Sequence, residues 1–155
     1  HHPQGDGVYR VHRAGRADVP ALAALLSDDE IGRTREGAEM ARYEEAYDAI
    51  ARDSAHYLAV VRAEDDRIIG TMQLTIIPGL SRGGTARLQI EGVRVAATER
   101  SHGVGTAMLE WAHDHGRHRG ATLVQVTTDR ARERAQAFYA RLGYDSSHVG
   151  FKRAL

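Results

Sequence analysis

A valine-rich run, a turn with two glycines and an apolar helix follow one another directly in residues 91–112 (EGVRVAATERSHGVGTAMLEWA). The apolar alternation that ends at Val95 predicts a strand. From Val104 the apolar residues recur every three or four positions, which predicts a helix to Arg119, with Gly120 as its end. A strand that turns at once into a helix packs that helix against its own sheet, so the chain is predicted to combine a sheet with covering helices.

The same periodicities predict the order of the other elements. Two strands joined by the polar turn EDD form a hairpin, and a strand–helix–strand unit follows it. This order favours an α/β class with a mixed sheet flanked by helices. Asp18 is predicted to cap the first helix, and residues 27–37 are predicted to be a surface loop. In chain order the predicted strands are 8–13, 56–63, 67–77, 86–95, 122–128 and 149–155, and the predicted helices are 19–26, 40–50, 104–119 and 132–144.

Length, charge and cysteine content limit the classes of function. With 155 residues we expect one domain, over residues 8–155, and we expect residues 1–7 to be disordered or derived from a purification tag. The 21 basic and 21 acidic side chains balance, so no nucleic-acid partner is expected. The chain has no cysteine, which excludes disulfides, thiolate metal sites and a cysteine nucleophile and fits a reducing cytoplasm. No apolar run reaches the ~20 residues of a membrane span, so no membrane partner is expected.

The turn before the helix of residues 104–119 has the features of an anion site. The first N–H groups of a helix have no partner inside it, and the helix dipole leaves partial positive charge there. Gly103 and Gly105 permit positive φ and a close approach, and Arg100 and His102 add charge. Together they predict a cradle for a pyrophosphate. The alternative is an ordinary strand-to-helix turn with solvated basic residues, since the full Rossmann and Walker patterns are absent.

Gly92 interrupts the alternation of its strand. Strict alternation would place the charged Arg94 among apolar side chains. A β-bulge at Gly92 would remove this conflict, bend the strand, and leave its backbone free to pair with an extended ligand. With the bulge, Leu88, Ile90, Val93 and Val95 are predicted to face the core, and Arg87, Gln89, Glu91 and Arg94 to face the other way.

These residues resemble the GNAT superfamily of acyl-CoA-dependent N-acyltransferases. The stretch IEGVRVAATERSHGVGTAMLEWA resembles its acetyl-CoA motif, and AFYARLGY (137–144) resembles its later Phe-Tyr-x-x-Leu-Gly-Phe segment. The resemblance implies the GNAT fold, a mostly antiparallel central sheet flanked by helices, with the fourth and fifth strands splayed apart. It also implies an N-acetyltransferase that moves an acetyl group from acetyl-CoA, without a metal, to a primary amine of a small molecule or peptide. The amine would attack directly in a ternary complex.

The resemblance assigns the cofactor contacts residue by residue. The backbone of Val93, Arg94 and Val95 would pair with the pantetheine arm of acetyl-CoA. Arg132 occupies the position where the family often has an asparagine, and it would meet a phosphate instead of the arm. The residues that would surround the pyrophosphate are Arg100, Ser101, His102, Gly103, Val104, Gly105 and Thr106.

Two residues receive catalytic roles from the resemblance. Glu91 would take the proton of the amine, directly or through water, and Tyr139 would protonate the departing sulfur. A free N–H near Val93 would stabilise the oxyanion. The alternatives are an exposed strand glutamate paired with Arg87 or Arg94, and a core aromatic beside Phe138.

The acceptor is the least determined part of the site. In the family its contacts come from the first two helices and their loop, while Arg82 and Arg87 would suit an acceptor carboxylate. Tyr43, Arg82 and Arg87 are therefore the predicted acceptor residues. A homodimer is compatible with the sequence, and a non-catalytic acyl-CoA sensor or a nucleotide-binding module stays open. The candidates from the first two helices and their loop are Asp28, Asp29, Glu30, Tyr43, Glu44 and Tyr47.

Overall fold

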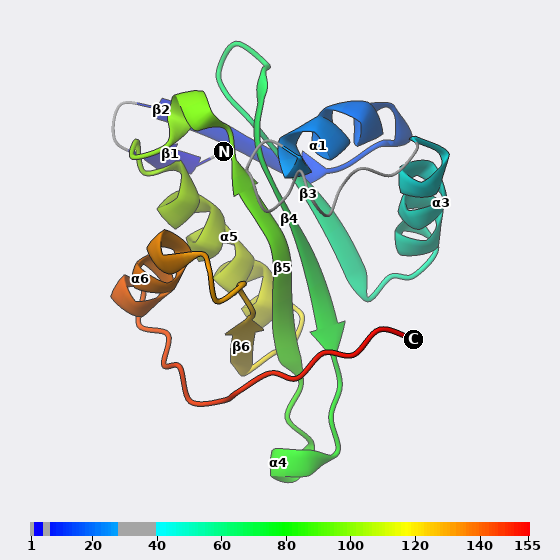
Figure 1. Ribbon diagram of the computed structural model, residues 1–155, viewed down its shortest axis with the longest axis vertical. Coiled ribbons are helices and arrows are strands. Elements are labelled where there is room, and N and C mark those ends of the chain that lie inside the picture. Colours follow the sequence, from blue (N-terminus) through cyan, green and yellow to red (C-terminus); the bar gives the residue numbers. More distant parts are fainter. Residues whose placement is uncertain (1, 5–6, 28–39) are drawn as a thin grey trace. The chain divides into compact units, whose positions relative to one another are not determined.

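The computed structural model describes residues 2–4, 7–27 and 40–155 (Figure 1). The chain divides into two compact units, His1–Gln125 and Val126–Leu155, which we call the sheet unit and the C-terminal unit. Residues 2–4 form a strand inside the segment for which we predicted disorder or a tag origin. The prediction of one domain over residues 8–155 stays a prediction.

The strands form one mixed sheet in the order β1-β2-β3-β4-β5-β6. The four pairs formed by β1 to β5, each strand with the next, are antiparallel. Thr122 N–H donates to the Ala86 carbonyl (3.1 Å), and Gln125 bonds Gln89, also 36 positions away, so β6 runs parallel to β5. The predicted mixed, mostly antiparallel sheet is confirmed. The strands are β1 His2–Gln4, β2 Gly7–Arg13, β3 His56–Arg62, β4 Ile68–Ile77, β5 Arg87–Val95 and β6 Leu123–Val126.

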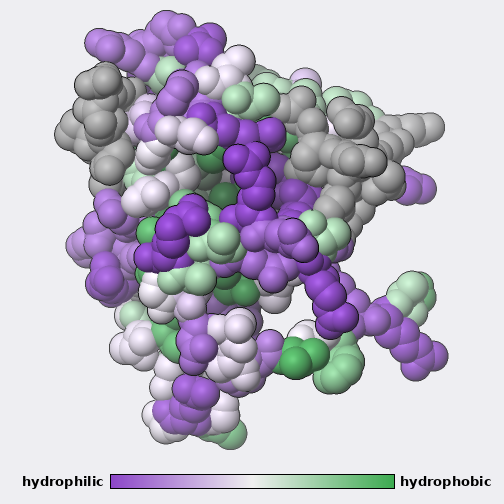
Figure 2. All heavy atoms as spheres, turned by 60° about the vertical axis from the view of Figure 1, so that its left-hand side comes forward, coloured by the Kyte–Doolittle hydropathy of each residue, from purple (hydrophilic) through white to green (hydrophobic). Residues whose placement is uncertain are grey.

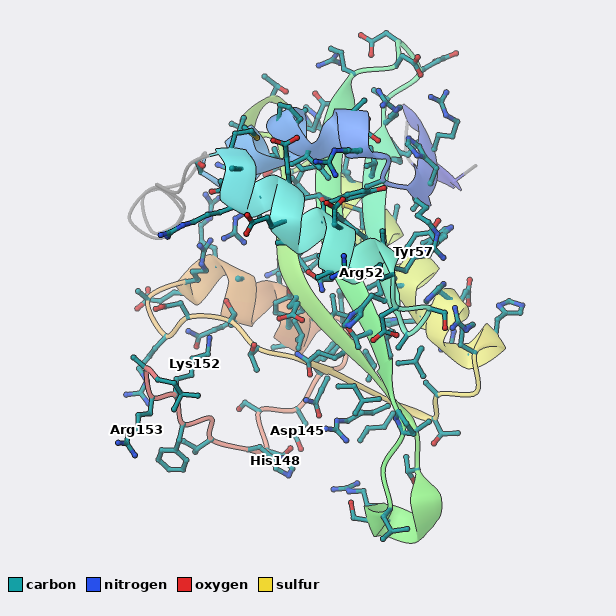
Figure 3. The ribbon with its side chains drawn as sticks, turned by 90° about the vertical axis from the view of Figure 1, so that its right-hand side faces the viewer. Arg52, Tyr57, Asp145, His148, Lys152 and Arg153 are labelled. Atoms are coloured by element: carbon teal, nitrogen blue, oxygen red, sulfur yellow. The ribbon has the colours of Figure 1, made fainter. Side chains whose placement is uncertain are left out.

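Different helices cover the two faces of the sheet (Figures 1 and 3). Leu88 packs on α5, because an added Cβ at Gly116 would lie 2.9 Å from its Cδ2 atom. On the other face Leu22 of α1 packs with Val60 of β3, and Tyr47 of α3 packs against the same cluster. We call these the α5 face and the α1 face. The helices are η1 Arg16–Asp18, α1 Val19–Leu26, α3 Met40–Ala51, α4 Ser81–Gly84, η2 Ala97–Glu99, α5 Val104–His118 and α6 Glu133–Arg141.

The space-filling view in Figure 2 is dominated by hydrophilic side chains with smaller hydrophobic groups between them. This agrees with the 27% of charged residues in the sequence. Of the helices that the structure describes, none is both long enough and apolar enough to cross a membrane.

Two predictions about the ends of elements need correction. Asp18 is the N-cap residue of α1, as predicted, but its side chain makes no capping bond to that helix. Its carboxylate instead accepts hydrogen bonds from the Gly15 N–H (2.8 Å) and from Arg62 (2.9 Å), because a 3₁₀ turn precedes the helix. Residues 149–155 form no strand. Val149 and Phe151 are 71% and 93% exposed there, so the apolar side chains of the alternating pattern are not buried as they would be in a strand of a sheet with one face on a core.

Candidate functional site

The turn between β5 and α5 contains two residues with positive φ. Ser101 has φ 69°, and Gly103, the N-cap of α5, has φ 82°. The first helical hydrogen bond runs from the Ala107 N–H to the Gly103 carbonyl (3.1 Å). The N–H groups of the residues before Ala107 therefore have no acceptor within the helix. They lie together at the N-terminal end of α5, next to the turn. Such a turn fits an anionic group such as a pyrophosphate.

The two glycines of the turn play different parts. Gly103 has the predicted positive φ, whereas Gly105 lies in the first turn of α5 and is not among the glycines with positive φ. Ser101 has the second positive φ instead. Sequence reasoning missed it because serine does not favour this conformation, and only its place before His102-Gly103 hints at it.

A residue far away in the sequence holds this turn. Tyr9 of β2 is buried, with 6% of its surface exposed, and its hydroxyl donates to the His102 carbonyl (3.3 Å). The Arg100 Nε atom donates to the Val95 carbonyl (3.3 Å), which ties the turn to the end of β5. The alternation of the first strand places Tyr9 in the core but gives no sign of its hydroxyl contact.

The predicted bulge at Gly92 is confirmed. Glu91 pairs with Gln73 and Arg94 pairs with Thr71, so two residues of β5 stand opposite one residue of β4. Gly92 has φ 62°, which favours glycine. Since residues 71 and 73 of β4 point to the same face, Glu91 and Arg94 also share that face, as predicted.

The end of α1 lies over this bulge. An added Cβ at Gly92 would lie 3.9 Å from the Cδ2 atom of Leu26, the last residue of α1. Past the bulge the Val93 carbonyl accepts a hydrogen bond from the Arg94 guanidinium (2.8 Å), and the Ala96 N–H donates to Ile69 (2.8 Å). The bulge therefore sits between a helix end and the positive-φ turn.

Glu91 points into solvent at the edge of the bulge. Its side chain is exposed and lies opposite Gln73 of β4. Among the described residues it forms no ion pair, either with Arg87 or with Arg94. The alternative of an ion-paired strand glutamate is thus not what the structure has.

Two candidate residues belong to the C-terminal unit and are described within it. Tyr139 of α6 packs its ring edge-on against Phe138 and Tyr144, with centroid distances of 5.3 and 5.5 Å. Burial, together with the nearby Tyr139, raises the pKa of Tyr144, which keeps that hydroxyl protonated. Arg132 is the N-cap residue of α6, and its carbonyl accepts the Gln136 N–H (3.1 Å). Tyr139 therefore packs beside Phe138, as the alternative assignment of Tyr139 as a core aromatic residue requires.

The structure separates the predicted acceptor residues. Tyr43 lies on α3, whereas Arg82 lies on α4 at the tip of the β4–β5 hairpin, at the end of the sheet unit away from α3 (Figures 1 and 3). Arg87 begins β5, next to Gly79. Tyr43 and Arg82 therefore do not line one small pocket. Asp28, Asp29 and Glu30 lie outside the described residues.

A small cavity next to α3 is too small for a substrate. It has a volume of about 50 Å³ and is lined by residues that include Tyr47 and Leu58. The Tyr47 hydroxyl donates to the Ala14 carbonyl (3.1 Å), so it serves the packing of α3. The described residues contain no group of three or more side chains able to hold a metal ion.

Comparisons with known proteins agree with this geometry. The model of the acetyltransferase (GNAT) family matches residues 20–144. Over 67 residues the chain is 36% identical to the aminoalkylphosphonate N-acetyltransferase of Salmonella typhimurium, which covers 43% of this chain and 44% of that protein. The chain therefore spans less than half the length of this curated relative.

Solved structures share the fold over nearly the whole chain. The crystal structure described as a transcriptional regulator from Bacillus halodurans C-125 has a TM-score of 0.90 at 34% identity, covering 96% of this chain and 100% of that chain. The aminoglycoside N-acetyltransferase AAC(6')-Iy, in complex with CoA, has a TM-score of 0.78 at 16% identity, covering 98% of this chain and 97% of that chain. At 16% identity, the similarity to the aminoglycoside N-acetyltransferase shows a shared fold alone.

Proposed function

The chain belongs to the acetyltransferase (GNAT) family, and from this premise we propose that it moves an acetyl group from acetyl-CoA to a primary amine of a small molecule or peptide. The observation that carries the proposal is the turn of Ser101 and Gly103, placed between the bulged end of β5 and the start of α5. We propose that it acts in the cytoplasm, either as a monomer or as a homodimer.

In this proposal three parts of the chain hold acetyl-CoA. The pyrophosphate lies at the start of α5, where the N–H groups of Val104, Gly105 and Thr106 and the basic Arg100 and His102 would meet it. The pantetheine arm lies along the backbone of Val93–Val95, and Arg132 of the C-terminal unit meets a phosphate. Acetyl-CoA supplies the activated thioester, and the bulge is where an extended arm finds unpaired backbone groups.

Three groups of the chain take part in the transfer. Glu91 receives the proton that the attacking amine loses as its nitrogen forms the new C–N bond. A backbone N–H at the bulge donates to the thioester oxygen, on which negative charge develops. As the C–S bond breaks, the Tyr139 hydroxyl gives its proton to the sulfur. Each group acts directly on the ternary complex, and no acyl group is carried by the protein.

Thermal shifts with different ligands and a transfer assay test this function. Acetyl-CoA at 100 times its Kd should stabilise the fold by ~2.7 kcal/mol, which raises Tm by roughly 5–10 °C for a chain of this size, whereas ATP and NAD should not. Mass spectrometry of an amine and peptide library incubated with the protein and acetyl-CoA should show products heavier by one acetyl group. A Gly103→Val variant, which crowds the turn, is the control and should lose the thermal shift. Equal shifts with ATP or NAD would indicate a nucleotide-binding module.

Tyr9→Phe tests the support of the turn. The substitution keeps the ring and removes the hydroxyl that holds His102. Because a neutral hydrogen bond contributes ~0.5–1.5 kcal/mol, we expect the Kd of acetyl-CoA, measured by calorimetry, to rise about 2- to 10-fold. Tyr47→Phe removes a similar bond to the Ala14 carbonyl, away from the turn, and should leave the Kd unchanged. An unaltered Kd in Tyr9→Phe would show that the turn needs no such support.

One observation favours a second function. The Bacillus halodurans protein, at 34% identity, is described as a transcriptional regulator, and a regulator of this fold could sense acyl-CoA without turnover. Release of free CoA thiol in the presence of an amine panel distinguishes the two. Binding of acetyl-CoA without any amine-dependent thiol release would support the sensor.

A further inference from the structure

One guanidinium of the sheet unit holds three elements together. Arg62 of β3 donates from Nη2 to Asp18 Oδ1, just before α1 (2.9 Å), and from Nη1 to the Asp66 carbonyl in the β3–β4 turn (2.8 Å). Its Nε atom donates to Nε2 of His12 on β2 (2.9 Å). The Arg62 and Asp18 side chains are only 21% and 14% exposed, so this ion pair is largely withdrawn from water. We call the three contacts the Arg62 clamp.

His12 takes part in the clamp as a neutral acceptor. Its Nδ1 atom lies 2.9 Å from the Arg13 carbonyl. Because a carbonyl oxygen only accepts, Nδ1 carries the ring proton, and Nε2 keeps the lone pair that accepts from Arg62. The planar guanidinium reaches all three acceptors at once, which the single ammonium group of a lysine could not do in the same geometry. The clamp therefore depends on arginine at this position.

The clamp fixes the start of α1. Asp18 is the N-cap residue of this helix, and its second carboxylate oxygen accepts from the Gly15 N–H (2.8 Å). The helix has 8 residues, Val19–Leu26. A helix this short is not stable alone, so its contacts with the rest of the protein determine its place. Leu22 in its middle packs with Val60 of β3, and the clamp adds the contact at its start.

The other end of α1 lies over the bulge of β5. The Cδ2 atom of Leu26 is 3.9 Å from the position of an added Cβ at Gly92, so this leucine covers the residue that has no side chain. The helix thus crosses from Arg62 of β3 to Gly92 of β5 on the α1 face (Figure 3). Because it spans ~12 Å, a tilt of ~5° at its start moves its last residue by ~1 Å.

We propose that Arg62 is a positioning residue for acetyl transfer, which acts through Asp18 and α1 to keep Leu26 against the bulge. The inference rests on the proposed function, because it takes the bulge as the place where the thioester and the amine meet. Gly92 stands between Glu91, which receives the amine proton in that proposal, and the backbone that would hold the thioester. An error of ~1 Å in the placement of reacting groups can lower the rate by ~10²-fold.

The binding of acetyl-CoA should not depend on the clamp. Other contacts hold the turn before α5. The Tyr9 hydroxyl donates to the His102 carbonyl, and the Arg100 Nε atom donates to the carbonyl at the end of β5. Neither contact involves α1 or the residues of the clamp. Loss of the clamp should therefore slow the transfer of the acetyl group and leave the affinity for acetyl-CoA as it is, which distinguishes a positioning role from general stabilisation of the fold.

Arg62→Gln tests the clamp, and Arg67→Gln is the matched control. Arg67 has 54% of its side chain exposed and pairs with Asp65 in the β3–β4 turn, so its replacement removes the same charge and leaves the clamp in place. With acetyl-CoA and the amine of the library that reacts fastest, Arg62→Gln should lower kcat about 10- to 100-fold. Its Kd for acetyl-CoA, measured by calorimetry, should stay within about twofold of the parent's, because the two sites share no contact. Arg67→Gln should change neither quantity.

A double variant tests the route through Asp18. Asp18→Asn keeps an oxygen that accepts from the Gly15 N–H and removes the charge that Arg62 binds. If Arg62 acts through Asp18, both single variants slow the transfer, and the double variant Asp18→Asn/Arg62→Gln is no slower than Arg62→Gln alone. Arg62→Lys, which keeps the charge opposite Asp18, should recover part of the loss. Rates are measured well below the Tm of each variant, and Asp18→Asn carries the test if Arg62→Gln does not fold.

The outcomes separate this inference from the proposed function. A kcat of Arg62→Gln equal to that of Arg67→Gln would overturn the inference and leave the N-acetyltransferase intact. So would an affinity for acetyl-CoA that falls in proportion to kcat, or losses that add up in the double variant. Binding of acetyl-CoA by the parent chain without transfer to any amine would overturn the proposed function itself. A slower transfer at unchanged Kd, shared by Asp18→Asn, would support the inference.

Discussion

Glu91→Gln is expected to lower kcat/KM for acetyl transfer by ~10²–10⁴ at neutral pH, the usual contribution of a positioned acid or base. Glutamine keeps the shape of the side chain and its place opposite Gln73 in β4, but it cannot take the proton of the attacking amine. The deficit should shrink as pH rises, because a larger fraction of the amine is then already unprotonated. Steady-state rates between pH 6 and 10 measure both effects.

A matched variant controls for the general effect of losing one negative charge. Glu64→Gln removes one carboxylate from an exposed position in the β3–β4 turn, away from the bulge, and should retain the activity of the parent. A Glu91→Gln variant with the same pH profile and rate as Glu64→Gln would show that the strand carboxylate has no part in proton transfer. Acetyl-CoA binding should be the same in both.

Tyr139→Phe is expected to lower kcat at least tenfold with little change in the affinity for acetyl-CoA. The variant keeps the ring that packs against Phe138 and Tyr144 and removes only the proton that would go to the departing sulfur. The loss should be smaller for an acetyl thioester with a more acidic thiol, because that thiolate leaves with less help. Kinetics with acetyl-CoA and with such a thioester measure both quantities.

Tyr144→Phe is the appropriate comparison for this variant. Its hydroxyl lies on the neighbouring ring of the same aromatic group, and we assign it no proton transfer. If Tyr139→Phe turns over as fast as the parent, or if both variants lose activity equally, Tyr139 is a packing residue.

Much of the sheet unit is predictable from sequence because its signals are local. The alternation in 56–63 and 67–77, with a polar turn between them, produces the β3–β4 hairpin. The bulge was predictable for a different reason. A charged Arg94 in an apolar run cannot face a core, so the phase had to change near Gly92, and the register confirms this.

The parts that were not predictable depend on contacts between distant segments. Asp18 looks like a helix cap, but its carboxylate binds Arg62 and the Gly15 N–H instead. Ser101 has a positive φ, and the next residue, His102, is held by the Tyr9 hydroxyl 93 positions away, a contact that no local pattern indicates. The alternating pattern at residues 149–155 predicts a strand, yet a strand also needs a neighbour with free backbone groups.

Gly92 has one more consequence. With that residue left out, Val93 would stand opposite Met72, and the pairs Glu91–Gln73, Arg94–Thr71 and Val95–Gly70 would follow one another in an uninterrupted ladder. Every side chain of β5 would keep the face that it has now. Gly92 is therefore an insertion into an otherwise regular strand. It bends the strand and leaves one residue unpaired, and it changes the face of no other side chain of β5.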